Sequence, residues 1–205
     1  KLIAAMTMKK AIDDNGEALQ EKPQAYKAVF QNTYNSQEKG IRFIVHKTYS
    51  NATGSDQLTD NQFQFQLEAV TEGAPMPENT VNGKSIAPST PGGRVDFPNT
   101  KFGTGDQGKS FVYKVSEVIP DGAENGTLNG TTYDRNAYYI QVTVTAEGGR
   151  GADVNTEIQY YRDAKCTQEI KPGSEDLYQV EPGVYRLWFH NSYTAKPATV
   201  TIQGS

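Results

Sequence analysis

Alternation of apolar and polar residues with a period of two constrains the fold of this chain more than any other feature. The pattern recurs in seven segments, residues 41–49, 62–70, 94–102, 110–118, 137–146, 157–163 and 184–193. Period two is typical of strands with one buried face, and turn-forming residues such as Gly, Pro, Asn and Asp lie between the segments. Seven such strands predict an all-β fold, an antiparallel two-sheet sandwich.

Composition indicates a globular domain without a nucleic-acid or membrane partner. The chain has 205 residues, a formal net charge of -4 and no block of Lys and Arg. No apolar run approaches the roughly 20 residues of a membrane span. Cys166 is the only cysteine, so no internal disulfide can form. If the domain is extracellular, something other than a disulfide must stabilise it.

The pattern Phe-x-Asn-x-Tyr occurs twice, at residues 30–34 and at residues 189–193, each time after an alternating run. The residues before the first copy read as two strands and a turn, which is marginal as a domain of its own. We therefore interpret residues 1–35 as the closing strands of a preceding repeat plus a linker. Residues 36–195 would form one sandwich domain, and residues 196–205 a linker or the start of the next segment.

Lys47, Glu117 and Asn191 have the parity of the apolar residues in their segments, so all three point toward the predicted core. Each residue alone is explained by a frayed strand end or by a side chain that snorkels to water. Burying an ammonium, a carboxylate and an amide separately costs several kcal/mol each. If the three are inside, we therefore expect them to converge and satisfy one another.

Convergence of these three groups has a chemical consequence. Burial lowers the pKa of a lysine by up to about 5 units, and the neutral Lys47 amine could then attack the Asn191 carboxamide carbon. A buried, protonated Glu117 could hydrogen-bond the amide oxygen as charge develops there, and then pass a proton to the departing ammonia. The predicted product is an isopeptide bond between Lys47 and Asn191.

Lys47 in the first strand, Glu117 in YKVSEV, the segment TTYDRNAYYIQVTVTA and the terminal Phe-x-Asn-x-Tyr together resemble the streptococcal pilin isopeptide linkage domain. The resemblance covers residues 36–195 and implies an Ig-like sandwich of that type. It implies that Lys47 is the nucleophile, Asn191 the acceptor and Glu117 the catalytic acid. Asn32 would be the acceptor of the preceding repeat.

The same resemblance implies a function and a location. It implies a structural stalk domain of a pilin or adhesin, built as a tandem repeat, on the extracellular surface or cell wall of a Gram-positive bacterium. Neighbouring repeats or pilin subunits would be its partners, with sortase and a host receptor as further candidates. Because the chain would react once, on itself, we do not expect an enzyme.

The alternative is a β-sandwich binding module. Trp188 has outward parity and, with Tyr160 or Tyr161 beside it, could present a platform to a glycan or to a host protein.

We expect neither a cofactor nor a metal. Residues 103–108 have the glycine spacing of a dinucleotide-binding loop, but a strand follows where that loop requires a helix. His46 and His190 flank crosslink residues on the opposite parity, where we expect them to be solvated. Two ligands make a poor metal site.

Overall fold

The computed structural model describes residues 38–51, 58–147 and 153–195. All of these residues belong to one compact unit, Ser36–Ser205. The predictions for residues 1–35, Asn32 among them, and for residues 196–205 fall outside the described residues. Within the described part of the chain, no helix has the length and apolar character needed to cross a membrane.

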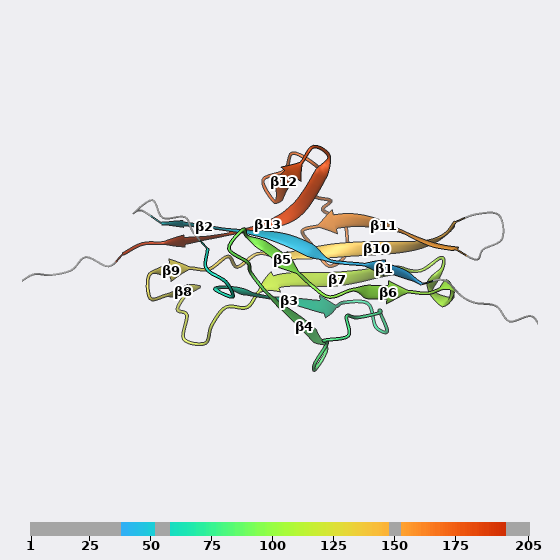
Figure 1. Cartoon of the computed structure of the whole chain (residues 1–205), viewed down its shortest axis with the longest axis horizontal. Coiled ribbons are helices and arrows are strands. Elements are labelled where there is room, and N and C mark those ends of the chain that lie inside the picture. Colours follow the sequence, from blue (N-terminus) through green and yellow to red (C-terminus); the bar gives the residue numbers. More distant parts are fainter. Residues whose placement is uncertain (1–37, 52–57, 148–152, 196–205) are drawn as a thin grey trace, which may run out of the picture. The chain divides into compact units, whose positions relative to one another are not determined.

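Nearly all regular structure in the described residues is β (Figure 1). The strands are β1 Lys39–Ile41, β2 Ile44–Asn51, β3 Gln64–Ala69, β4 Lys84–Pro88, β5 Arg94–Asp96, β6 Thr100–Phe102, β7 Ser110–Glu117, β8 Thr127–Leu128, β9 Thr131–Thr132, β10 Ala137–Glu147, β11 Asp153–Tyr161, β12 Leu177–Glu181 and β13 Val184–Tyr193. A 3-10 turn, η1 Thr104–Asp106, precedes β7. The all-β prediction is confirmed.

Two larger sheets and a small one contain these strands. One larger sheet has the order β11-β10-β7-β3-β4, and the other has the order β5-β2-β13-β9-β8 with β12 beside β13. The small sheet pairs β1 with β6. All neighbouring strands are antiparallel except β2 and β13, which are parallel. This pair departs from the predicted antiparallel arrangement. Parallel neighbours need a long crossover connection, and the chain between β2 and β13 supplies one by passing through the other sheet.

The hydrophobic core lies between the inner faces of the two larger sheets. Phe189 of β13 packs edge-on against Phe65 of β3 and Tyr138 of β10, with ring centroids 5.1 Å apart in both pairs. Along β7, burial alternates strictly, so Phe111 and Tyr113 face inward. The strand parity read from the sequence therefore holds for this strand.

Short strands account for most differences from the predicted segments. Residues 94–102 form two strands, β5 and β6, because Pro98 between them has no N–H to donate to a ladder. Strands β4, β8, β9 and β12 lie outside the predicted segments. They have two to five residues each, which is too short for period two to stand out from chance.

Candidate functional site

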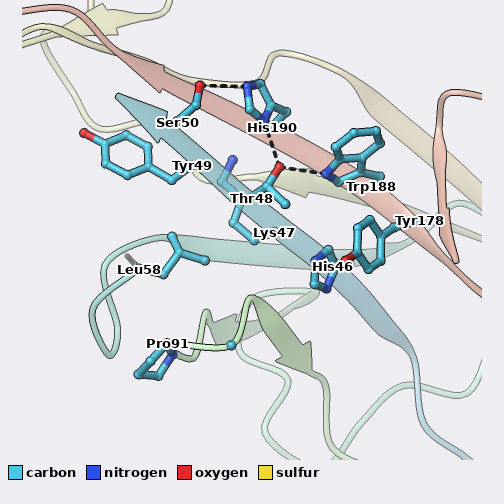
Figure 2. Close-up of a pocket in the computed structure, with 11 residues that line it drawn as sticks. His46, Lys47, Thr48, Tyr49, Ser50, Leu58, Pro91, Tyr178, Trp188 and His190 are labelled. Carbon is cyan, nitrogen blue, oxygen red and sulfur yellow. Dashed lines mark hydrogen bonds between the residues drawn. The ribbon is translucent and has the colours of Figure 1, made fainter. Parts of the chain in front are cut away.

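Neighbouring strands place Lys47 and Asn191 on one inner face. β2 and β13 run side by side (Figure 2), with Phe189 opposite Lys47 and Asn191 opposite Tyr49. Asn191 is therefore two positions along from the partner of Lys47, on the same face of the sheet. Diagonal neighbours at this spacing are within reach of a long side chain.

Glu117 approaches from the opposite sheet. It is the last residue of β7, and its backbone pairs with Phe65 of β3. The structure thus brings together the three residues that parity singled out. We call Lys47, Glu117 and Asn191 the triad.

The Glu117 carboxylate bridges the other two members of the triad. Lys47 Nζ donates a hydrogen bond to Glu117 Oε2 at 2.9 Å, and Asn191 Nδ2 donates one to Glu117 Oε1 at 2.7 Å. Lys47 is 1% exposed, Glu117 4% and Asn191 0%. The triad is therefore a closed cluster inside the sandwich and not a set of frayed strand ends.

Aromatic rings enclose the Lys47 amine. Its Nζ lies 5.0 Å from the centroid of the Phe63 ring and 5.7 Å from that of Phe65. Phe63 in turn packs against Tyr49 and Tyr133, with centroid distances of 5.3 Å and 5.8 Å. These rings exclude water and lower the local dielectric, so the electrostatic interaction between the Lys47 amine and the Glu117 carboxylate is stronger than it would be in water.

Burial shifts both ionisable members of the triad toward their neutral forms. Desolvation lowers the pKa of the Lys47 amine, and the charge and hydrogen bond of Glu117 oppose that shift. Desolvation raises the pKa of the Glu117 carboxyl, against the opposing effects of Lys47 and of the Asn191 amide. A proton that moves from Lys47 to Glu117 along their hydrogen bond leaves a neutral amine beside a neutral acid.

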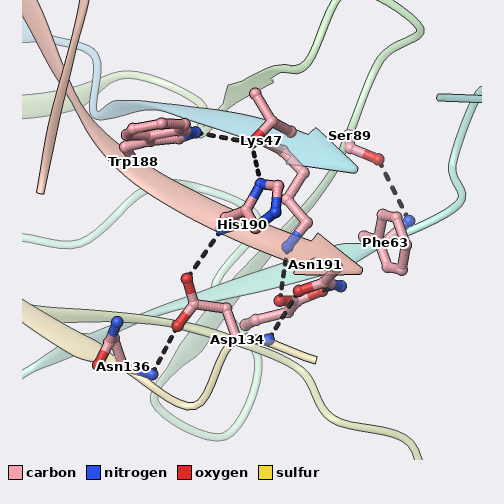
Figure 3. Close-up of polar contacts among 10 residues, drawn as sticks. Lys47, Phe63, Ser89, Asp134, Asn136, Trp188, His190 and Asn191 are labelled. Atoms are coloured by element: carbon pink, nitrogen blue, oxygen red, sulfur yellow. Dashed lines mark hydrogen bonds and ion pairs between the residues drawn. The ribbon is translucent and has the colours of Figure 1, made fainter. Parts of the chain in front are cut away.

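The Asn191 amide oxygen has a partner that the sequence did not indicate. The backbone N–H of Asp134 donates to Asn191 Oδ1 at 2.6 Å (Figure 3). A backbone N–H can only donate, so the atom that faces it is the oxygen, and the amide nitrogen faces Glu117. The expectation that Glu117 contacts the amide oxygen is therefore wrong in this structure, where Glu117 holds the leaving nitrogen.

Asp134 lies in the loop between β9 and β10, where strand parity gives no information, so the sequence pattern does not single it out. Aspartate at such a position is typical of a turn, and its side chain does accept the Asn136 N–H at 2.9 Å. The sequence does not indicate that the loop reaches β13, because that contact depends on the fold.

Comparison with known proteins places the chain in a family. The model of the FctA family, Spy0128-like isopeptide containing domains, matches residues 43–194. The chain belongs to this family. No curated protein sequence matches it.

Two solved structures similar to this FctA-family chain are major pilins from Streptococcus pyogenes. The first has 18% sequence identity and a TM-score of 0.43, covering 76% of this chain and 51% of the pilin. The second, the T-13 major pilin, has 18% identity and a TM-score of 0.39, covering 78% of this chain and 55% of the pilin. The chain thus spans about half the length of the pilins it matches.

The outer face of β2 and β13 in this FctA-family domain carries a polar network. Trp188 Nε1 donates to Thr48 Oγ1 at 2.7 Å, and Thr48 Oγ1 lies 2.7 Å from His190 Nδ1 (Figure 2). Ser50 Oγ lies 3.2 Å from the other ring nitrogen of His190. These bonds tie the two parallel strands together on the side opposite the triad.

His46 is buried, which corrects the prediction that it is solvated. The residue does point away from the triad, but Tyr178 of β12 stacks on its ring at a centroid distance of 3.7 Å. Only 8% of His46 remains exposed. The error arose because β12, which covers this face, was not among the predicted strands. His190 is exposed, as predicted.

Trp188 is half-buried beside an open hollow of about 380 Å³ that Tyr178 and Pro91 also line. Trp188 packs against Tyr178 and His190, at centroid distances of 5.8 Å and 6.1 Å, and not against the Tyr160 or Tyr161 of the alternative platform. The Trp188 N–H donates to Thr48 of β2, so the indole is tied to β2 and packs against β12 on the outer face.

Proposed function

We propose that this chain is a structural stalk domain of a Gram-positive pilin or surface adhesin, stabilised by an isopeptide bond between its own Lys47 and Asn191. Glu117 assists the reaction. The observation that best supports this proposal is the bridging carboxylate, which accepts hydrogen bonds from the Lys47 amine at 2.9 Å and the Asn191 amide at 2.7 Å.

The reaction begins with proton transfer from the Lys47 ammonium to the Glu117 carboxylate. The neutral amine then adds to Cγ of Asn191, and the carbonyl electron pair moves onto Oδ1. Glu117 passes its proton to Nδ2 and takes one from the new secondary ammonium. The C–Nδ2 bond breaks, ammonia leaves and the carbonyl re-forms. Glu117 ends protonated, as it was when the amine attacked, so no other reactant is required.

Such a bond serves a mechanical role. Lys47 and Asn191 are 144 positions apart (191 minus 47), on strands near the two ends of the domain. Tension that enters along β2 and leaves along β13 passes through covalent bonds and does not pull the residues between them. By loop-closure entropy, a crosslink of this span stabilises the fold by roughly 5 kcal/mol.

The mechanical role also suggests where the domain is located and what it assembles with. A crosslinked stalk domain is useful outside the cell, in a tandem array or polymer exposed to force and proteases, and the family match supports that setting. Neighbouring repeats or pilin subunits are then its direct partners. Sortase would join such subunits, and a host receptor would be the target of the assembled fibre. The domain turns over once, on itself, and is not an enzyme.

Intact mass measurement of the denatured full chain tests the proposal. We expect the wild type to be lighter than its sequence mass by one ammonia, about 17 Da. Lys47→Ala, Glu117→Ala and Asn191→Ala should all have their full sequence masses. Lys114→Ala is the matched control, because Lys114 projects from β7 to a half-buried pair with Glu68 on the outward face of the strand, and it should keep the loss. A wild type at full mass would refute the proposal.

A further inference from the structure

We propose that the backbone N–H of Asp134 stabilises the oxyanion of the bond-forming step, and that the Asp134 side chain positions this N–H. The inference rests on the proposed crosslinking reaction and assigns a group that the triad lacks. Glu117 contacts the amine and the amide nitrogen, so a separate donor is needed at the amide oxygen.

The geometry fits an oxyanion donor. The Asp134 N–H lies 2.6 Å from Asn191 Oδ1, measured from nitrogen to oxygen, before any reaction. When the amine adds to Cγ, the carbonyl pair becomes a negative charge on that oxygen. A fixed N–H in a site shielded from water stabilises such a charge far more than it stabilises the neutral amide.

The side chain of Asp134 locks its own N–H in place. Oδ2 accepts the backbone N–H of His190 at 2.8 Å, and Oδ1 accepts the N–H of Asn136 at 2.9 Å (Figure 3). One carboxylate therefore ties the loop to β13 at the residue next to Asn191. The loop cannot move away from the acceptor without breaking the bond to His190, and the bond to Asn136 fixes the shape of the turn.

Two groups therefore have separate roles in the reaction. Glu117 moves protons between Lys47 Nζ and Asn191 Nδ2, and the Asp134 N–H holds the oxygen while the C–N bonds exchange. Ammonia is the only product besides the bond, and the N–H donor keeps its own proton throughout.

The rate of crosslinking tests this assignment directly. The full chain is made in a short labelling pulse by cell-free translation, quenched in urea and then diluted into buffer. Intact mass follows the loss of ammonia with time. Replacing residue 134 with the α-hydroxy analogue of aspartate turns its N–H into an ester oxygen and keeps the carboxylate. We expect this chain to crosslink on the order of 10²-fold more slowly.

Side-chain variants test the positioning role. Asp134→Ala keeps the N–H but frees the loop, so it should also slow the reaction, whereas Asp134→Asn, which retains one acceptor oxygen, should be intermediate. Asp163→Ala is the matched control. Asp163 also accepts backbone N–H groups of its own turn, from Lys165, Thr167 and Gln168, so its loss disturbs a turn to a similar extent. It should crosslink at the wild-type rate.

A spectroscopic readout separates the oxyanion role from a loss of fold. In a Lys47→Met background, which cannot react, the ¹³Cγ resonance of Asn191 reports the hydrogen bond to its oxygen. The ester substitution should move this resonance upfield, while Trp188 fluorescence stays that of the folded chain.

The outcomes distinguish the inference from the reaction on which it rests. If the wild type crosslinks and the folded ester chain reacts as fast, or its Asn191 resonance is unmoved, the Asp134 assignment is wrong and the crosslink stands. If the wild type never loses ammonia, the proposed function fails first.

Discussion

At the residue scale, the members of the triad tolerate burial because each has hydrogen-bond partners inside the fold. Lys47 and Asn191 both donate to Glu117, and the Asn191 oxygen accepts from the loop at Asp134. A buried polar group without such partners destabilises the fold, because it loses its hydrogen bonds to water and gains none inside the protein. The arrangement that makes these residues tolerable in the core also aligns them for reaction.

Crosslinking should have a bell-shaped dependence on pH. The reacting state, neutral Lys47 beside protonated Glu117, holds one titratable proton between the two groups. At low pH a second proton keeps the amine charged, and at high pH the pair lacks the proton that departing ammonia needs.

Burial lowers the pKa of Lys47 and raises that of Glu117, and both shifts favour the neutral pair that reacts. The measurement is the initial rate of ammonia loss after dilution from urea into buffers from about pH 4 to pH 11. A rate that rises with pH and never falls would contradict this assignment of the protons.

Strand parity was sufficient to find the triad and insufficient for its surroundings. Lys47, Glu117 and Asn191 lie in long alternating strands, where a polar residue on the apolar face is visible in the sequence. Asp134 acts through a loop backbone, which has no such signal. His46 had the correct parity but is covered by Tyr178 from a strand too short to predict.

At the element scale, the turn between β4 and β5 fixes the strand that carries Lys47. The Lys47 N–H donates to Gly93 O at 2.6 Å. Gly93 has φ +75, and a Cβ built there would lie 2.1 Å from Lys47 O. Only glycine allows the turn to approach β2 so closely.

Gly93→Ala should therefore destabilise the domain and slow crosslinking, since relief of the clash moves the backbone of Lys47. We expect a loss of about 2 kcal/mol in the free energy of unfolding, from left-handed backbone strain and the displaced strand. Urea unfolding measures the first effect and intact mass the second. In Gly92→Ala, the control, the new Cβ meets nothing within 4 Å. Equal losses in the two variants would contradict this role for Gly93.

The sequence predicted the long strands well and their pairing poorly. β7, β10 and β13 were found almost to the residue because eight or more alternating positions define each of them. The parallel alignment of β2 and β13 was not foreseen, because alternation along a strand says nothing about the direction of its neighbour. This alignment decides that Lys47 and Asn191 lie diagonally opposite each other.

At the scale of the whole molecule, a bond between β2 and β13 closes most of the domain into one loop. The double variant Lys47→Met/Glu117→Gln removes the bond without leaving a buried charge unpaired, so it isolates the effect of the crosslink. We expect its Tm to be lower by about 10–20 °C, from roughly 5 kcal/mol of loop entropy in a domain of this size. Thermal unfolding followed by Trp188 fluorescence measures the difference. Equal Tm values would contradict a stabilising crosslink.

The wild type and the double variant should differ even more in their response to mechanical force. Because β2 and β13 are parallel, tension between the chain ends loads the pair in shear. In the wild type it should reach the proposed Lys47–Asn191 bond before the residues between them. In single-molecule pulling, unfolding of the double variant should lengthen the chain by about 500 Å more than unfolding of the wild type, at about 3.5 Å for each of 144 residues. Release of the same length by the wild type would exclude a mechanical role.

Tryptic peptide mapping tests the central claim most directly. Trypsin does not cut after an acylated Lys47, nor after Lys196, which Pro197 follows, so the bond predicts one branched peptide of residues 43–84 and 187–205. Its mass should be the sum of the two peptides less one ammonia, about 17 Da, with fragment ions that place the branch at Lys47 and Asn191. Recovery of residues 187–205 as a free, linear peptide, with cleavage at Lys47, would contradict the account.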